Sequence, residues 1–298
     1  MERIRRSWQL FKKSVSVMFE HKELLIFPIV IVALTLCIGA IFVIPMLGGL
    51  ALEGAGAMAT HRPLLAKGFN PANLASYNPV VGLDIVCLYF VSMVSATYFN
   101  VAFYHEIMEA LQDRPVSIVR GLNFALTRWK SILLWSVFAG IVGFLISKLE
   151  QKFGFIGRIV IGMVGLAWSV ACVFVVPVII VEEHTSNPFA LLKKSVLTLR
   201  QAWGESLAGY VGVAVGGWLV MVFSVVWLGG AMAVSFALHS VFLGALAFVF
   251  WVVAVAIFAY LSSVANQIFR CALFLYASTG AMPRPFDNDM AALAWKTK

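Results

Sequence analysis

Six long apolar runs limit what this chain can fold into more than any other feature of its sequence. They cover residues 24–52, 80–111, 132–147, 155–181, 207–237 and 241–277. A helix needs about 20 residues to cross the hydrocarbon core of a bilayer. In lipid every backbone amide must be bonded within its own segment or barrel, and the runs are continuous rather than alternating, so they predict transmembrane α-helices. The third run is short and is expected to borrow flanking residues. The sixth is too long, and should either continue into water or break near Asn266 and Gln267.

The composition supports the same class of protein. Hydrophobic residues make up 61% of the chain and charged residues only 12%. A soluble domain of this size could not cover so much apolar surface with so few charges. The first run is also longer than the apolar region of a cleavable signal peptide, which has about 7–15 residues. The sequence therefore predicts an all-α polytopic membrane protein, with residues 1–298 forming one transmembrane domain.

Lysines and arginines are unevenly divided between the two sides of the predicted membrane. The side of the N-terminus holds 17 of the 22 basic residues. The other side holds only Arg62, Lys67, Lys148, Lys152 and Arg158. Because cytoplasmic loops carry the excess of basic residues, both termini are expected in the cytoplasm, with residues 280–298 as a cytoplasmic tail of an inner-membrane protein. The net charge of +8 is thus a topology signal, and nucleic acid is not an expected partner.

Amphipathic helices are expected at the cytoplasmic interface before three of the predicted spans. Residues 4–18 and 187–203 space their apolar residues by three and four, and residues 115–129 do so more weakly. Asn187 can cap the second segment, with Pro188 as its first helical residue. One-sided stripes with many charges predict helices that lie in the interface. The basic residues expected to face anionic headgroups are Arg5, Arg6, Lys12, Lys13, Lys193 and Lys194.

These segments also suggest an internal repeat. The sequence LFKKS at 10–14 corresponds to LLKKS at 191–195, and Arg120 lies near the equivalent position in the middle segment. Each unit would be one interfacial helix followed by a transmembrane hairpin. The approximate units are 1–111, 112–182 and 183–279, all entering from the cytoplasm, so the repeats are parallel. The extracytoplasmic loop at 53–79 has little periodicity, and the sequence suggests no function for it.

Three stretches resemble a family of prokaryotic polytopic membrane proteins of unassigned function. They are SWQLFKKSVSVMFEHKELLIFP, YFNVAFYHEIMEALQDRPVSIVRGL and VVPVIIVEEHTSNPFALLKKSVLTLRQAWGES. The resemblance implies six spans and brings no known activity. A looser resemblance is to the membrane domain attached to some glycerophosphodiester phosphodiesterases, carried by Pro177, Glu182, Ala190, Leu191 and Ser195. The chain contains no phosphodiesterase catalytic domain.

Polar residues inside the spans are the candidate ligand-binding residues. Span two places Thr97, Asn100 and Tyr104 on one helix face, and span six does the same with Ser262, Asn266 and Arg270. Such residues face the bundle, either in interhelical hydrogen bonds or in a polar cavity. The cavity would be lined by Asn100, Glu182, Asn266 and Arg270. Arg270 is expected to reach the interface or to pair with an acid, Glu182 rather than Glu106.

Pro177 is expected to kink span four, because proline removes a helix hydrogen bond. A static packing kink and a moving hinge both fit, so Pro177 is the hinge candidate.

No enzyme signature is present in the sequence. There is no HExxH, GxSxG or P-loop motif, and the HEIME sequence at 105–109 lacks the second histidine of a metal-binding helix. Its charged side chains are expected to reach water at a helix end. The cysteines, Cys37, Cys87, Cys172 and Cys271, fit buried small hydrophobic residues. No cofactor, metal or catalytic residue is therefore predicted.

The favoured function is a non-enzymatic membrane protein that binds or moves a lipid or another amphipathic molecule. One alternative is an accessory or scaffold subunit that regulates another membrane complex. A channel is the other, although the spans lack the ring of charges that an ion pore needs. The expected partners are membrane lipids, anionic ones among them, and a second copy or another membrane protein.

Overall fold

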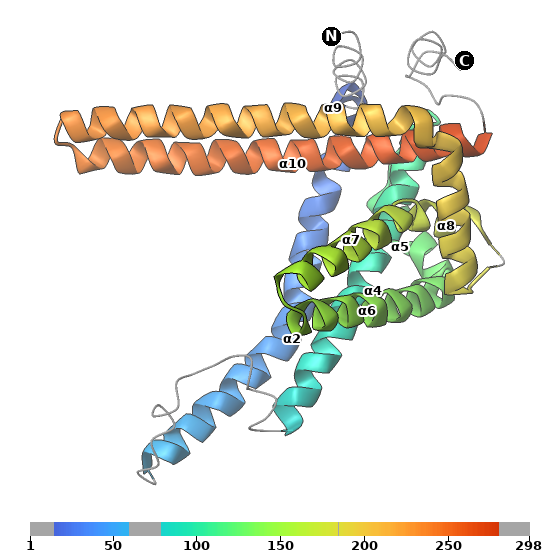
Figure 1. Cartoon of the computed structure of the whole chain (residues 1–298), viewed down its shortest axis with the longest axis horizontal. Coiled ribbons are helices and arrows are strands. Elements are labelled where there is room, and N and C mark those ends of the chain that lie inside the picture. Colours follow the sequence, from blue (N-terminus) through green and yellow to red (C-terminus); the bar gives the residue numbers. More distant parts are fainter. Residues whose placement is uncertain (1–14, 60–78, 184, 280–298) are drawn as a thin grey trace.

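The computed structural model of the chain describes residues 15–59, 79–183 and 185–279 (Figure 1). Within these ranges it is all-helical and contains no strand. The helices are α2 (Glu23–Ala59), α4 (Pro79–Ala110), α5 (Ile118–Thr127), α6 (Trp129–Lys152), α7 (Phe155–Ala171), α8 (Val175–Val181), α9 (Pro188–Ala237) and α10 (Val241–Thr279). Arg5, Arg6, Lys12 and Lys13, with most of the first predicted amphipathic segment, lie outside the described residues.

Six stretches of these helices are long and apolar enough to cross a membrane. They are Glu23–Ile44, Leu83–Ala110, Trp129–Lys152, Gly157–Val181, Val220–Ala237 and Val241–Thr279. The all-α, six-span class predicted from the sequence is thereby confirmed. The short third run does gain residues at both ends. The sixth run stays helical through Asn266 and Gln267, so the alternative of a break there is wrong.

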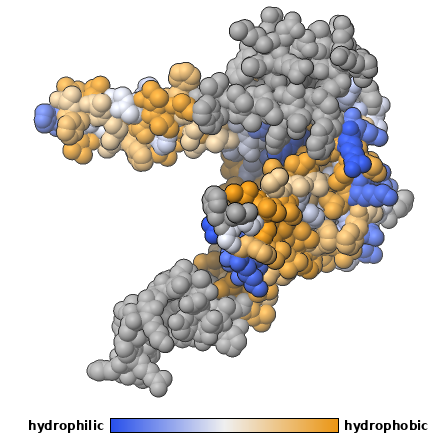
Figure 2. All heavy atoms as spheres, in the orientation of Figure 1, coloured by the Kyte–Doolittle hydropathy of each residue, from blue (hydrophilic) through white to orange (hydrophobic). Residues whose placement is uncertain are grey.

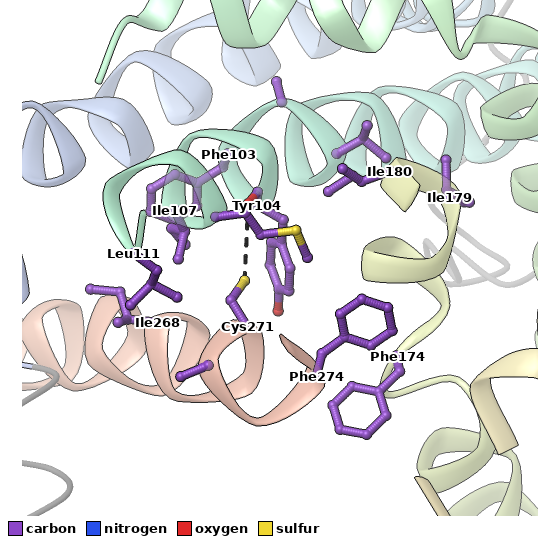
Figure 3. Packing of buried hydrophobic residues seen from close by; sticks show 14 of the residues in the cluster. Phe103, Tyr104, Ile107, Leu111, Phe174, Ile179, Ile180, Ile268, Cys271 and Phe274 are labelled. Carbon is purple, nitrogen blue, oxygen red and sulfur yellow. Dashed lines mark hydrogen bonds between the residues drawn. The ribbon is translucent and has the colours of Figure 1, made fainter. Parts of the chain in front are cut away.

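The buried core lies where one end of several helices meets. It joins the start of α2, the last turns of α4, α8 and the last third of α10. Figure 3 shows this convergence, with Phe103 and Ile107 of α4, Phe174 before α8, and Ile268 and Phe274 of α10. On the predicted topology these are the cytoplasmic ends of the spans. The core therefore holds the spans together at one side of the membrane.

Away from this core the helices expose apolar side chains. Leu36 of α2, Phe223 of α9 and Val241 of α10 are 68%, 70% and 88% exposed. Helices α9 and α10 form an antiparallel hairpin that projects from the other helices, and Figure 2 shows apolar residues along it. Water would strongly disfavour such a surface, whereas lipid tails are as apolar as these side chains. The chain is a multi-pass membrane protein by this architecture.

The fourth span is broken, but not at Pro177 itself. Helix α7 ends at Ala171 and α8 begins at Val175, so Pro177 occupies the third position of α8. A proline there needs no hydrogen-bond acceptor, and its ring and missing N–H disrupt the turn before it. The kink expected at Pro177 therefore lies at residues 172–174. Ser195 Oγ of α9 bridges the break, accepting from the Phe174 N–H at 3.2 Å and donating to the Ala171 carbonyl at 2.6 Å.

Helices α5 and α9 begin close to where the sequence predicts. The Asn187 side chain caps α9 by accepting from the Phe189 N–H, and Pro188 is the first helical residue, as predicted. Helix α9 then continues for 50 residues into span five, because no proline follows Pro188 before Ala237. It changes direction after its first turns (yellow to orange in Figure 1) instead of ending near residue 203. Helix α5 begins at Ile118, capped by Ser117.

The four cysteines are all within the described ranges, and each is a free thiol. Cys271 is buried, as expected, but Cys37 and Cys87 are exposed on the outer faces of their helices. An apolar run that faces lipid can place a cysteine there as readily as any other small apolar residue. The expectation of buried packing is therefore wrong for these two residues.

Candidate functional site

A cavity of about 690 Å³ lies beside the buried core, between α4, the broken fourth span and α10. Its lining residues are Asn100, Tyr104, Leu166, Ser169, Val170, Cys172, Val173, Phe174, Val176, Leu199, Ser263, Asn266, Gln267, Arg270 and Leu273. Figure 3 shows Tyr104 pointing from α4 toward α10, with Phe174 close to the end of α10. Non-helical backbone at membrane depth is tolerated where it lines such a cavity, and the break at 172–174 does so.

One part of the cavity wall is polar. Helix α10 contributes Ser263, Asn266, Gln267 and Arg270, which share a face because residues three and four apart are neighbours on a helix. Helix α4 adds Asn100 and Tyr104 in the same way. Arg270 alone carries a formal charge among the lining residues, all of which are described.

The other part of the wall is apolar and reaches the protein surface. It consists of Leu166, Val170, Val173, Phe174, Val176, Leu199 and Leu273. Leu166 is 66% exposed and Ser169 is also exposed, so the cavity opens to the side at α7. An amphipathic cavity with a lateral opening can accept a molecule with a polar group and an apolar chain.

Three of the four predicted ligand-binding residues meet in this cavity. Asn100, Asn266 and Arg270 are on its wall, whereas Glu182 is absent from the described lining. The Glu182 carboxylate instead forms an ion pair with Lys194 of α9. Glu182 follows the last residue of α8, and α9 packs against α8, so Lys194 is the nearer cation. The favoured Glu182–Arg270 pair is therefore replaced by Glu182–Lys194. Lys193 is exposed.

A second polar cluster at the end of α4 was not anticipated. The Glu106 side chain is 0% exposed, so the expectation that charged side chains of 105–109 reach water is wrong for this residue. Arg120 of α5 donates from Nη2 to Oε2 at 2.7 Å and from Nε to Oε1 at 3.0 Å. The Ser117 N–H donates to Oε2 at 2.7 Å, and His105 Nδ1 lies 3.1 Å from Oε1.

This cluster is a structural joint between α4 and α5. The hydrogen bond to Glu106 raises the pKa of Arg120 above its ordinary value, so the guanidinium stays charged. The His105 ring stacks on Phe124 of α5, with 3.8 Å between ring centroids. The sequence contained only a weak sign of the Glu106–Arg120 pair. Arg120, like Lys194, is a basic residue on the helix that follows a span with an acidic residue near its end. The described residues contain no group of three or more His, Cys, Asp or Glu side chains that could hold a metal.

The fold and the cavity define a polytopic α-helical membrane protein with an amphipathic cavity near one end of its spans. The chain belongs to DUF6159, a family of unknown function whose family model matches residues 75–283. No curated protein and no solved structure matches it. The predicted membership in a membrane family of unassigned function agrees with this match. The looser resemblance to the membrane domain of glycerophosphodiester phosphodiesterases has no support from these comparisons.

Proposed function

We propose that the chain is a non-enzymatic membrane protein that binds, or moves, a phospholipid, through the negative charge of its phosphate, in the cavity between α4, α7 and α10. The observation that carries the proposal is the combination of Arg270, Asn266 and Asn100 with the apolar side chains that make up much of the remaining lining. An ionisable residue at membrane depth is by default a candidate for a ligand or ion pathway, because its burial there is costly.

The size of the cavity fits part of a lipid. Ligand sites commonly have volumes of about 300–1,000 Å³, and this cavity has about 690 Å³. A headgroup and the first carbons of its chains would fill that space. The remaining chain would leave through the opening beside Leu166 and Ser169 into the surrounding bilayer.

The proposed orientation places the cavity near the cytoplasmic face of the cell (inner) membrane, with both termini in the cytoplasm. The count of basic residues supports this orientation. Exposed basic side chains of α9, such as Lys193, would attract anionic lipids to the same face.

Native mass spectrometry of the purified protein tests the proposal. Arg270→Gln removes the charge on the cavity wall and keeps a polar side chain. Arg200→Gln is the matched control, because Arg200 is exposed on α9 and does not line the cavity. Arg270→Gln should reduce bound phospholipid by about tenfold or more, since hydrogen bonds to charged groups are the strong ones. Arg200→Gln and Glu182→Gln should retain it. Equal lipid content in all four proteins, each with an unchanged melting temperature, would refute the proposal.

An accessory subunit is the second candidate, favoured by the α9–α10 hairpin. A groove of about 320 Å³ lies between these helices and is lined mainly by apolar side chains: Val220, Met221, Ser224, Trp227, Phe250, Trp251, Ala254, Val255 and Phe258. Trp251 Nε1 is buried there without a hydrogen-bond partner among the described residues. A helix of another membrane protein could cover this groove. Copurification of a stoichiometric partner that is lost on Trp251→Ala, with lipid content unchanged, would favour this role over lipid binding.

A further inference from the structure

We infer that the ligand is a phospholipid whose headgroup carries an N–H or O–H donor in addition to its phosphate, such as an ethanolamine or glycerol headgroup. This inference rests on the proposed function, since it concerns the same cavity. Its basis is a pair of hydrogen-bond acceptors on the cavity wall, which a phosphate cannot satisfy because a phosphodiester is itself an acceptor.

The first acceptor is the side chain of Gln267. Its Oε1 atom is buried and has no hydrogen-bond partner among the described residues. The Nε2 atom of the same amide is 3.5 Å from Ser263 Oγ, one turn earlier on α10. Gln267 lines the cavity three residues before Arg270. A buried acceptor that stays unbonded is unfavourable, so a donor placed in the cavity is favoured.

The second acceptor is the backbone carbonyl of Val173. It lies in the break between α7 and α8, and Val173 also lines the cavity. In an unbroken helix this carbonyl would accept from the N–H four residues later, which is at Pro177, and proline has no N–H. The break thus removes the usual intrahelical partner of this carbonyl at a residue that lines the cavity.

The cavity wall presents both hydrogen-bond donors and hydrogen-bond acceptors to a single ligand. Arg270 and the amide groups of Asn100 and Asn266 can donate to phosphate oxygens. Gln267 Oε1 and the Val173 carbonyl can accept from a headgroup beyond the phosphate. A choline headgroup has methyl groups where ethanolamine has N–H donors, so it would leave both acceptors unbonded. The cavity should therefore discriminate between these two headgroups, although they have the same net charge.

Two matched pairs of lipids test the inference with the full-length protein in nanodiscs. Phosphatidylethanolamine and phosphatidylcholine differ in donors at equal charge, as do phosphatidylglycerol and phosphatidylmethanol. Native mass spectrometry with equimolar mixtures of each pair should show about fivefold preference for the donor-bearing lipid, the effect of one additional hydrogen bond. Gln267→Leu should lower this preference while lipid binding persists. Arg270→Gln should weaken binding of both members of each pair.

The outcomes separate this inference from the proposed function. Lipid binding that depends on Arg270 but shows no donor preference, or a preference unchanged in Gln267→Leu, would overturn the inference and leave the proposed function standing. Lipid binding that is unaffected by Arg270→Gln would overturn both. Glycerophosphoethanolamine, the headgroup without acyl chains, should not compete at equal concentration, because it lacks contact with the apolar wall. Effective competition would overturn the assignment to a lipid.

Discussion

Arg120 of α5 holds the fully buried carboxylate of Glu106 in α4 through two hydrogen bonds of 2.7 and 3.0 Å. The arginine is partly accessible, with 38% of its side chain exposed, whereas the glutamate has no access to solvent. This pair joins the short helix α5 to the end of a transmembrane helix, next to the core that gathers the spans. The two charges depend on each other, because a buried carboxylate without its partner is strongly unfavourable.

Replacing Arg120 by methionine should therefore destabilise the protein more than replacing both members of the pair. We expect Arg120→Met to lower the free energy of unfolding by about 3–5 kcal/mol, the cost of leaving a buried charge uncompensated. Adding Glu106→Gln should recover a large part of this loss. Arg114→Met is the control, because Arg114 is 59% exposed and its pair with Glu109 is worth at most about 1 kcal/mol.

Unfolding of the purified protein in detergent measures these differences. A double variant no more stable than Arg120→Met would contradict the idea that the cost comes from the unpaired carboxylate.

A close helix contact beside the same pair gives a second prediction. A Cβ atom at Gly121 would lie 2.8 Å from the Ala102 carbonyl oxygen and 2.8 Å from Glu106 Cγ. Gly121→Ala should destabilise the protein by about 1–3 kcal/mol, because the backbone of α4 cannot move away freely. Gly162→Ala in α7 meets no atom within 4 Å, so it should be neutral or stabilise its helix by up to about 1 kcal/mol. Equal melting temperatures of the two variants would show that α5 does not pack this closely against α4.

The bridge across the broken fourth span gives a third prediction. Ser195 is buried and bonds two backbone groups at the break, one N–H and one carbonyl. Ser195→Ala should cost about 1–3 kcal/mol, because it leaves a buried backbone donor without its partner. Ser136→Ala is the matched control, since Ser136 is equally buried but only donates to the Ile132 carbonyl of its own helix. If both serine variants unfold at the same temperature, the hydroxyl of Ser195 does not stabilise the break.

The architecture could be predicted from the sequence because the bilayer limits it so strongly. Span length and hydropathy sufficed for six helices, and Asn187 with Pro188 marked the start of α9. Rules based on neighbouring residues were insufficient where contacts between helices far apart in the sequence determine the local structure. The break of span four occurs before Pro177, where Ser195 from another helix satisfies the backbone groups.

The residues of the candidate site divide in the same way, into those that the sequence could predict and those that depend on packing between helices. Asn100, Asn266 and Arg270 could be proposed from their spacing, because polar residues on one face of a span turn toward other helices. The partner of Glu182 and the burial of Glu106 depend on how α5 and α9 pack, which periodicity does not reveal. In the sequence Gln267 is only a polar residue next to Asn266. Its role as a hydrogen-bond acceptor can be inferred only from the structure of the cavity.

The membrane orientation is a fourth prediction. Reporter fusions after Lys298 and within the loop at Leu64 should report opposite sides of the membrane, with Lys298 in the cytoplasm, because basic residues concentrate on that side. Alkaline phosphatase and a fluorescent protein give complementary readings of each site. The same location for both fusions would contradict the six-span topology.

Photo-crosslinking to a lipid tests most directly the central claim that the cavity holds a phospholipid. The probe is a phosphatidylglycerol with a photoreactive group on the first carbons of one acyl chain, and the crosslinked peptides are identified by mass spectrometry. Labelling is expected at the apolar wall, on Val173, Phe174 or Leu273, and it should fall strongly in Arg270→Gln and persist in Arg200→Gln. Labelling spread evenly over the lipid-facing residues of α2 and the α9–α10 hairpin, and unchanged in Arg270→Gln, would contradict this claim.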